Sequence, residues 1–170
     1  MIKKIRFELT TKSYAEMGHL TFYKDDVPLV FNEAAATLTL ADGQTSKITA
    51  SASSVYTLYP AIYAFSKNGP EHNKSCWCAN AVGNGWIEFD FTPALPDDFA
   101  NKITFCCGQG EGYYPATYTL FFIDENKNKK QMMKPLYVNK HNGIFENWNI
   151  IRCMLGKNKK YYFLKPKDKR

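Results

Sequence analysis

The stretch 85–91, GWIEFDF, alternates large apolar residues with acidic ones at a period of two. Successive residues of a β-strand point to opposite faces, so one face carries Ile87, Phe89 and Phe91. The other face carries Trp86, Glu88 and Asp90. This pattern predicts a central strand that is buried on one side. If the indole of Trp86 lies in the core, the change Trp86→Ala is expected to cost about 3–5 kcal/mol.

Similar patterns occur along the rest of the chain, at 102–107 (KITFCC), 117–123 (TYTLFFI) and 148–155 (WNIIRCML). A first strand begins near Ile2, with one slip in its alternation. Residues 17–31 predict a hairpin that turns at 24–26, with Pro28 near a sheet edge, and Asp42-Gly43 predicts another turn. The segment 51–84 is polar and irregular, which predicts ordered loops. The predicted fold class is an all-β sandwich.

Composition and charge narrow the class of protein. The chain has 170 residues, of which 45% are apolar, 15% aromatic and 22% charged, which is typical of one folded domain. No apolar run is long enough to span a bilayer and no secretory signal precedes the first strand, so synthesis in a cytoplasm is expected. Residues 156–170 carry seven basic residues and one acid, and this segment accounts for the whole net charge of +6. The rest of the chain is neutral, so nucleic-acid binding is not expected.

The order of several motifs resembles the discoidin domain, also called the coagulation factor 5/8 type C domain. The motifs are GHLTFYKDDVPLV (18–30), ITASASS (48–54), YPAIYAFSKNG (59–69), Trp77 in a polar loop, GWIEFDF, KITF, YYPATYTLFFIDENKN (113–128) and WNIIRCML. The resemblance covers about Ile2 to Leu155. It implies an eight-stranded, galactose-binding-like jelly roll at 1–155, followed by a basic C-terminal tail at 156–170.

The same resemblance implies a non-enzymatic recognition module. Single-domain members of this kind occur in tailed-phage virions, on tails, baseplates, fibres or capsid surfaces, so the expected location is a virion assembled in the host cytoplasm. The expected partner is a glycan or a neighbouring virion protein, within a larger assembly or a homo-oligomer. No membrane association is expected.

In the discoidin family, recognition lies on loops at one end of the sandwich. The resemblance places two such loops here, one after the ASS motif and one between the two strands that follow the central strand. Tyrosines suit both sugar rings and protein partners, because each has a flat apolar face and a hydroxyl group. The predicted ligand-binding residues are Tyr56, Tyr59, Trp77, Asn80, Gln109, Glu111, Tyr113 and Tyr114, and Asn84 extends the patch.

The alternative function is a polysaccharide hydrolase that uses Glu88 and Asp90, two carboxylates about 7 Å apart on one strand face. A structural role for this pair is the simpler interpretation. The three histidines, at positions 19, 72 and 141, have no nucleophile at a recognisable spacing. The sequence therefore predicts a protein that is not an enzyme.

No metal or cofactor is predicted. Ser66 stands where many discoidin domains have an aspartate that helps to hold calcium, and Lys67 is beside it. The pairs Cys76/Cys78 and Cys106/Cys107 lack the spacing of a zinc knuckle, although a four-cysteine site is the alternative. Five cysteines without a secretory signal predict reduced and mostly buried thiols.

The tail contains an apolar block among its lysines, formed by Tyr161, Tyr162, Phe163 and Leu164. A disordered tail rarely keeps such a block. We expect it to dock, either as an added edge strand on its own sandwich or on a partner subunit.

Overall fold

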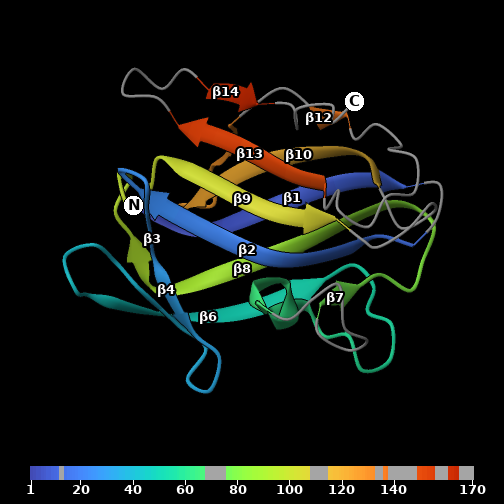
Figure 1. The fold of residues 1–170 in the computed structure, drawn as a ribbon, viewed down its shortest axis with the longest axis horizontal. Helices are drawn as coiled ribbons and strands as arrows, with labels where there is room; N and C mark the ends of the chain where they lie inside the picture. The colour runs from blue at the N-terminus through green and yellow to red at the C-terminus, as the bar shows by residue number, and fades with distance from the viewer. Residues whose placement is uncertain are drawn as a thin grey trace.

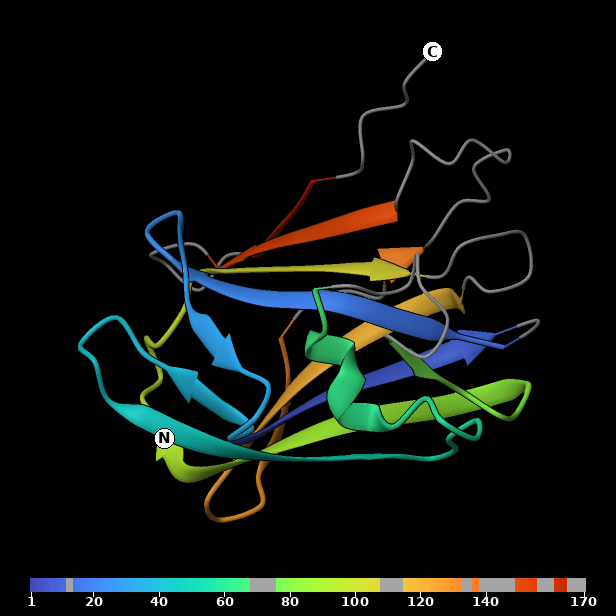
Figure 2. The same cartoon turned by 60° about the horizontal axis from the view of Figure 1, so that its bottom comes forward.

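The computed structural model describes residues 1–11, 14–67, 76–107, 115–132, 136–137, 149–155 and 161–164. Within these residues the chain is all-β, apart from one short 3-10 helix, η1 (Ala61–Phe65). Two antiparallel sheets face each other, as Figures 1 and 2 show. This arrangement confirms the predicted all-β sandwich.

The larger sheet contains eight of the described strands. Its order is β11 (Lys129–Gln131), β10 (Pro115–Asp124), β1 (Ile2–Thr11), β8 (Gly83–Leu95), β6 (Thr45–Ala52), β5 (Thr37–Thr39) and β4 (Val30–Asn32), and β12 (Leu136–Tyr137) pairs with β10. Strand β8 lies in the middle of this order. The prediction that residues 85–91 form a central strand is therefore confirmed.

The smaller sheet contains six described strands. Its order is β14 (Tyr161–Leu164), β13 (Asn149–Leu155), β9 (Lys102–Cys107), β2 (Glu16–Lys24) and β3 (Val27–Pro28), and β7 (Trp77–Cys78) pairs with β2. Pro28 lies on the edge strand β3, as predicted, where its missing N–H leaves no ladder hydrogen bond unmade.

Local sequence signals account for the turns and one irregularity. Asp25 and Asp26 connect β2 to β3 with φ values of 49° and 64°, which aspartate tolerates better than most residues. Gly43, in the predicted turn between β5 and β6, has a φ of 87°. The slip in the alternation of the first strand is a register shift between Ile2 and Lys4 in both of its pairings. Against β10 the shift adds one residue to β1, whereas against β8 the extra residues lie on β8, between Asp90 and Leu95.

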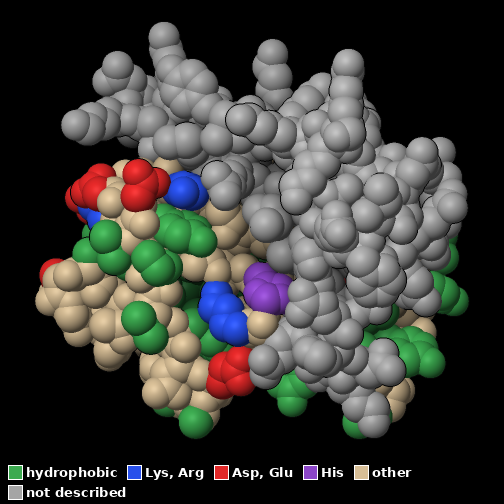
Figure 3. Space-filling view, in the orientation of Figure 1, with side chains coloured by type: hydrophobic (Ala, Val, Ile, Leu, Met, Phe, Trp, Pro, Cys, Tyr) green, Lys and Arg blue, Asp and Glu red, His purple; other side chains and the backbone are tan. Residues whose placement is uncertain are grey.

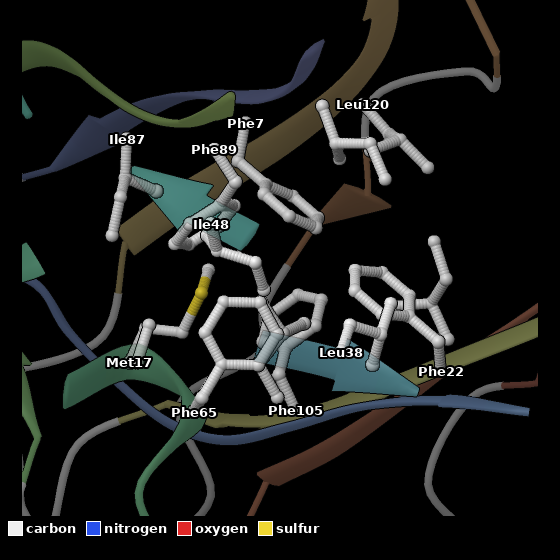
Figure 4. Packing of buried hydrophobic residues seen from close by; sticks show 14 of the residues in the cluster. Phe7, Met17, Phe22, Leu38, Ile48, Phe65, Ile87, Phe89, Phe105 and Leu120 are labelled. Atoms are coloured by element: carbon white, nitrogen blue, oxygen red, sulfur yellow. The ribbon is translucent and has the colours of Figure 1, made fainter. Parts of the chain in front are cut away.

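The core lies between the sheets and combines aliphatic side chains with many aromatic rings (Figure 4). Phe7 packs edge-to-face against Phe105 of the facing sheet, with ring centroids 5.3 Å apart. Phe65 of η1 contacts Phe89 at 4.9 Å and stacks on Phe31 at 4.6 Å. Edge-to-face rings contribute about 0.5–1.5 kcal/mol beyond their buried area. The helix η1 therefore supplies the ring that fills the core between β2, β4 and β8.

Trp86 does not lie in this core. Ile87, Phe89 and Phe91 are fully buried, so the opposite face of β8 points outward and carries Trp86, Glu88 and Asp90. The indole of Trp86 is half-buried beneath the guanidinium of Arg6, whose Cζ lies 4.3 Å from the ring centroid. The expected loss of 3–5 kcal/mol on Trp86→Ala is therefore corrected to a smaller value.

The segment 51–84 is less peripheral than its polar sequence suggests. Its described parts, 51–67 and 76–84, contain loops as predicted, but they also supply Phe65 and Trp77, which are almost completely buried. The polar residues around them form the hydrogen bonds of the loops, which lets two isolated aromatic side chains enter the core.

The C-terminal block Tyr161–Leu164 forms β14, which pairs antiparallel with β13 at the edge of the smaller sheet. This is one of the two arrangements that the sequence analysis allowed. Residues 156–160 and 165–170 lie outside the described residues.

We expect Phe89→Ala to destabilise the fold by about 3–5 kcal/mol, because it removes a fully buried ring. Trp86→Ala, on the opposite face of the same strand, is expected to cost about 1–2 kcal/mol, from the lost cation–π contact and half-buried apolar area. Chemical denaturation of both variants measures the difference. Equal losses would mean that the two faces of β8 are assigned wrongly.

Truncation after Leu155 removes β14 and exposes the backbone edge of β13, so we expect the shortened chain to self-associate. Sheet-edge pairing is not screened by ions, and the association should persist at high salt. Sedimentation velocity across a salt series measures it. Truncation after Leu164 is the control, because it removes four basic residues and keeps β14. Equal association of both variants would assign the effect to charge.

Candidate functional site

The strand register gathers several connections at one end of the sandwich. Thr11 at the end of β1 lies opposite Gly83 at the start of β8 and Pro115 at the start of β10. Strand β6 ends at the same side, where the N–H of Ser53 donates to the carbonyl of Trp86 at 2.8 Å. We call residues 53–60 and 76–82 the loop end. It contains four of the predicted ligand-binding residues.

Hydrogen bonds fix the two segments of the loop end to each other. The N–H of Tyr56 donates to the carbonyl of Cys78 at 2.8 Å, and the N–H of Cys78 donates to the carbonyl of Tyr59 at 3.4 Å. The indole Nε1 of Trp77 donates to the carbonyl of Ser54 at 3.1 Å, and the N–H of Asn80 donates to Ser54 Oγ at 3.0 Å. These hydrogen bonds tie the two segments together, and a restrained loop loses less conformational entropy when a ligand binds.

The tip of this loop is a tight turn that presents apolar side chains. The N–H of Tyr59 donates to the carbonyl of Tyr56 at 3.0 Å, and Leu58 between them has a φ of 74°. Leu58 is 58% exposed and Tyr56 is 49% exposed, while the rings of Tyr56 and Tyr59 lie 5.7 Å apart. A left-handed conformation is unfavourable for leucine by about 1–2 kcal/mol. The chain thus keeps an exposed apolar side chain at a position that suits glycine.

The structure brings some of the predicted ligand-binding residues together at the loop end and places one of them in the core. Tyr56, Tyr59 and the exposed Asn80 lie together at the loop end. Trp77 is fully buried, so the prediction that its indole contacts a ligand is wrong. Its ring fills the core beneath the loop, and its N–H satisfies a loop carbonyl. The predicted residues Gln109, Glu111, Tyr113 and Tyr114 lie outside the described residues.

Sequence reasoning missed Leu58 and Val55, which are exposed beside Tyr56. The available signal was an apolar run, VYTLYP at 55–60, in a segment that contributes no strand there. Such a run in a loop indicates either burial or a binding surface, and only the fold distinguishes the two.

Glu88 and Asp90 lie on the outer face of the larger sheet, within a network of ion pairs. Lys4 Nζ lies 2.9 Å from Glu88 Oε1 and 3.8 Å from Asp90 Oδ2, and Arg6 Nη1 lies 3.1 Å from Glu88 Oε2. The hydrogen bond to Glu88 raises the pKa of Lys4. Both oxygens of Glu88 thus contact cations, and these ion pairs tie β8 to β1 across the outer face of the sheet.

Glu8 extends this network along β1. Its Oε1 accepts hydrogen bonds from Arg6 Nε, at 3.1 Å, and from Lys129. Partial burial alone would raise the pKa of Glu8, but the hydrogen bond and charge of Lys129 together with Arg6 lower it below its usual value. The outer face of the sheet therefore carries alternating charges that neutralise one another.

The cysteines that the structure describes with side chains, Cys76 and Cys78, are free and buried. Burial raises the pKa of both thiols, that of Cys78 to about 12. Thiols that stay protonated are poor metal ligands and poor nucleophiles. Among the described residues, no cluster of three or more His, Cys, Asp or Glu side chains could hold a metal ion. Near Ser66, Lys67 donates a hydrogen bond to Thr21 Oγ1.

The charged side chains do not gather by sign on the face shown in Figure 3, where the described basic and acidic groups are intermixed. In the part of the chain that the structure describes, no helix is long and apolar enough to cross a membrane. Comparisons with protein-family models, curated proteins and solved structures each gave no match to this chain. The resemblance to the discoidin domain therefore rests on the sequence motifs alone.

We expect Glu8→Gln to make thermal stability less dependent on pH in acid. Because the pKa of Glu8 is lower in the folded chain than its usual 4.5, its ion pairs stabilise the fold above that pH and are lost as the pH falls through the lowered pKa. Thermal unfolding between neutral and strongly acid pH measures the effect. The control Glu33→Gln changes an exposed carboxylate in the turn before β5 and should leave the profile unchanged. A wild-type profile in Glu8→Gln would contradict the assigned pairing.

Proposed function

We propose that this chain is a non-catalytic recognition and assembly module that docks onto a neighbouring protein through its loop end. The observation that carries the proposal is Leu58, which is 58% exposed at a φ of 74°. Strained residues cluster at functional sites, where a side chain is kept despite its conformational cost. Glycine would relieve the strain, so the side chain of Leu58 has a use that the fold of the chain alone does not explain.

The chemistry of the loop end favours an apolar protein surface as its partner over a charged ligand. Its two segments, SSVYTLYP (53–60) and CWCANAV (76–82), contain no charged residue. Val55, Tyr56, Leu58 and Val82 are each more than 40% exposed. The buried centre of a protein interface has few charged residues and is rich in aromatic ones. The rigid loop tip matches that description, with Tyr56 and Leu58 as its anchors.

Two further observations support a non-catalytic role within an assembly. Glu88 and Asp90, the carboxylates that a hydrolase would need, are engaged by Lys4 and Arg6. The motif order resembles discoidin domains, which are recognition modules, and compact members of that kind occur on tailed-phage virions. A virion component is therefore the setting that we propose.

We expect Leu58→Gly to leave stability unchanged or to raise it by up to about 1 kcal/mol, because glycine adopts a positive φ without strain. The same change should weaken docking, since it removes an apolar anchor. Lys127→Gly is the matched control, because Lys127 also has a positive φ, 66°, and lies in the turn after β10 at the opposite end of the sandwich. It should relieve similar strain and leave docking intact.

Docking can be measured with a photo-crosslinking side chain at position 58 of the full chain, in particles or cells that contain it. We expect crosslinks to one protein species from position 58 and none from position 127. Crosslinks between two copies of the chain would identify the neighbour as a second subunit. Equal crosslinking from both positions, or none from position 58, would overturn the proposal.

A further inference from the structure

The outer face of the larger sheet contains a shallow groove that shares only Ser53 with the loop end. Its volume is about 490 Å³, within the range of small-molecule and cofactor sites. It crosses three neighbouring strands and the start of the loop after β6, and is lined by Glu8, Leu9, Thr10, Ser53, Asn84, Gly85, Trp86, Thr117 and Thr119. Strands lie about 4.8 Å apart, so four neighbouring segments span roughly 14 Å. That length suits a short linear ligand.

The aromatic element of this groove is Trp86, whose orientation is fixed. The guanidinium of Arg6 lies over the indole at 4.3 Å, and Arg6 is itself held by Glu8 and Glu88, each at 3.1 Å. An aromatic ring held in this way loses little conformational entropy when a ligand stacks on it. Arg6 covers one face of the indole, and the flat apolar face of a pyranose ring matches the other face, where Trp86 lines the groove.

Polar groups surround the platform on three strands. The hydroxyls of Thr10 and Thr117 lie 2.7 Å apart and Asn84 is exposed, so hydroxyl and amide groups are available to a ligand. Arg6 and Lys129 both donate to Oε1 of Glu8, which leaves Oε2 to accept a further hydrogen bond. These groups both donate and accept, as recognition of sugar hydroxyls requires.

The floor of the groove depends on Gly85. A Cβ atom there would lie 2.9 Å from Ser53 Oγ, so a side chain could not fit without displacing Ser53. Ser53 Oγ in turn accepts a hydrogen bond from the N–H of Trp86 at 2.9 Å. The glycine therefore allows the contact that joins the loop to the backbone of the platform residue.

We infer that this groove binds a neutral oligosaccharide, with Trp86 as the stacking platform and Glu8 as an acceptor for sugar hydroxyls. The carboxylate in the groove disfavours phosphate and acidic polymers, and the nearby cations are already neutralised by Glu8 and Glu88. The described residues that line the groove offer no exposed aliphatic anchor for a protein. The inference adds a second binding surface to the proposed recognition module and does not depend on the loop end.

The test is calorimetric titration of the full chain with neutral hexasaccharides of glucose, galactose, mannose and N-acetylglucosamine. We expect at least one to bind, with little dependence on salt. Trp86→Ala should weaken binding by about tenfold or more, whereas Trp86→Phe keeps an aromatic platform and should retain most of the affinity. Leu58→Gly should bind the sugar like the wild type, which separates this site from the loop end.

Trp86→Ala could lose sugar binding because it unfolds, so a second variant is needed that blocks the groove and leaves Trp86 in place. Thr119 lies directly opposite Glu8 in the β1–β10 register, so the arginine of Thr119→Arg can pair with the Glu8 carboxylate and fill the groove. We expect this variant to fold and to lose sugar binding. If no hexasaccharide binds, or if binding survives in both Trp86→Ala and Thr119→Arg, the inference is wrong. Loss in Leu58→Gly alone would place the sugar at the loop end instead.

Discussion

The antiparallel register of β1 against β8 is the constraint on which both faces of the larger sheet depend. It sets Ile5 opposite Phe89 and Phe7 opposite Ile87 inside the sandwich. The same alignment sets Arg6 opposite Glu88 and Glu8 opposite Trp86 on the outside. A slip of β1 by one residue would turn its side chains to the other face, so that Arg6 and Glu8 entered the core and Phe7 entered water. The aromatic core and the outer ion pairs therefore select the same register independently.

The sequence was informative where structure follows from local periodicity. The period-two pattern of 85–91 placed the central strand, and the irregularity near Ile2 marked a real bulge, because in both cases one face of a strand must stay apolar. Phe65 and Trp77 could not be assigned in this way. Phe65 lies in a five-residue helix too short to show a period, and its contacts with Phe22, Phe31 and Phe89 come from three distant strands. The strain at Leu58 likewise has no local signal, because the residue type there is the wrong one for its φ.

Two surfaces of different chemistry meet at Ser53. On one side of it the loop end is uncharged, apolar and closed by tight turns. On the other side the groove is polar and open, and it rests on a continuous sheet whose backbone pairing fixes the spacing of its side chains. Rigid strands position a repeating ligand well, whereas a protruding loop tip reaches a partner's surface. On the proposed assignments, the chain attaches through one surface and recognises a sugar with the other.

The burial of Cys76 and Cys78 has a consequence for the chemical lifetime of the chain. Thiol oxidation and disulfide exchange proceed through the thiolate, and burial raises the pKa of both thiols, which disfavours the thiolate at neutral pH. The Cys76 thiol is buried more deeply still. Both side chains are therefore expected to react slowly with oxidants and alkylating reagents while the chain is folded. We expect the region beneath the loop end to keep its thiols reduced in both reducing and oxidising surroundings.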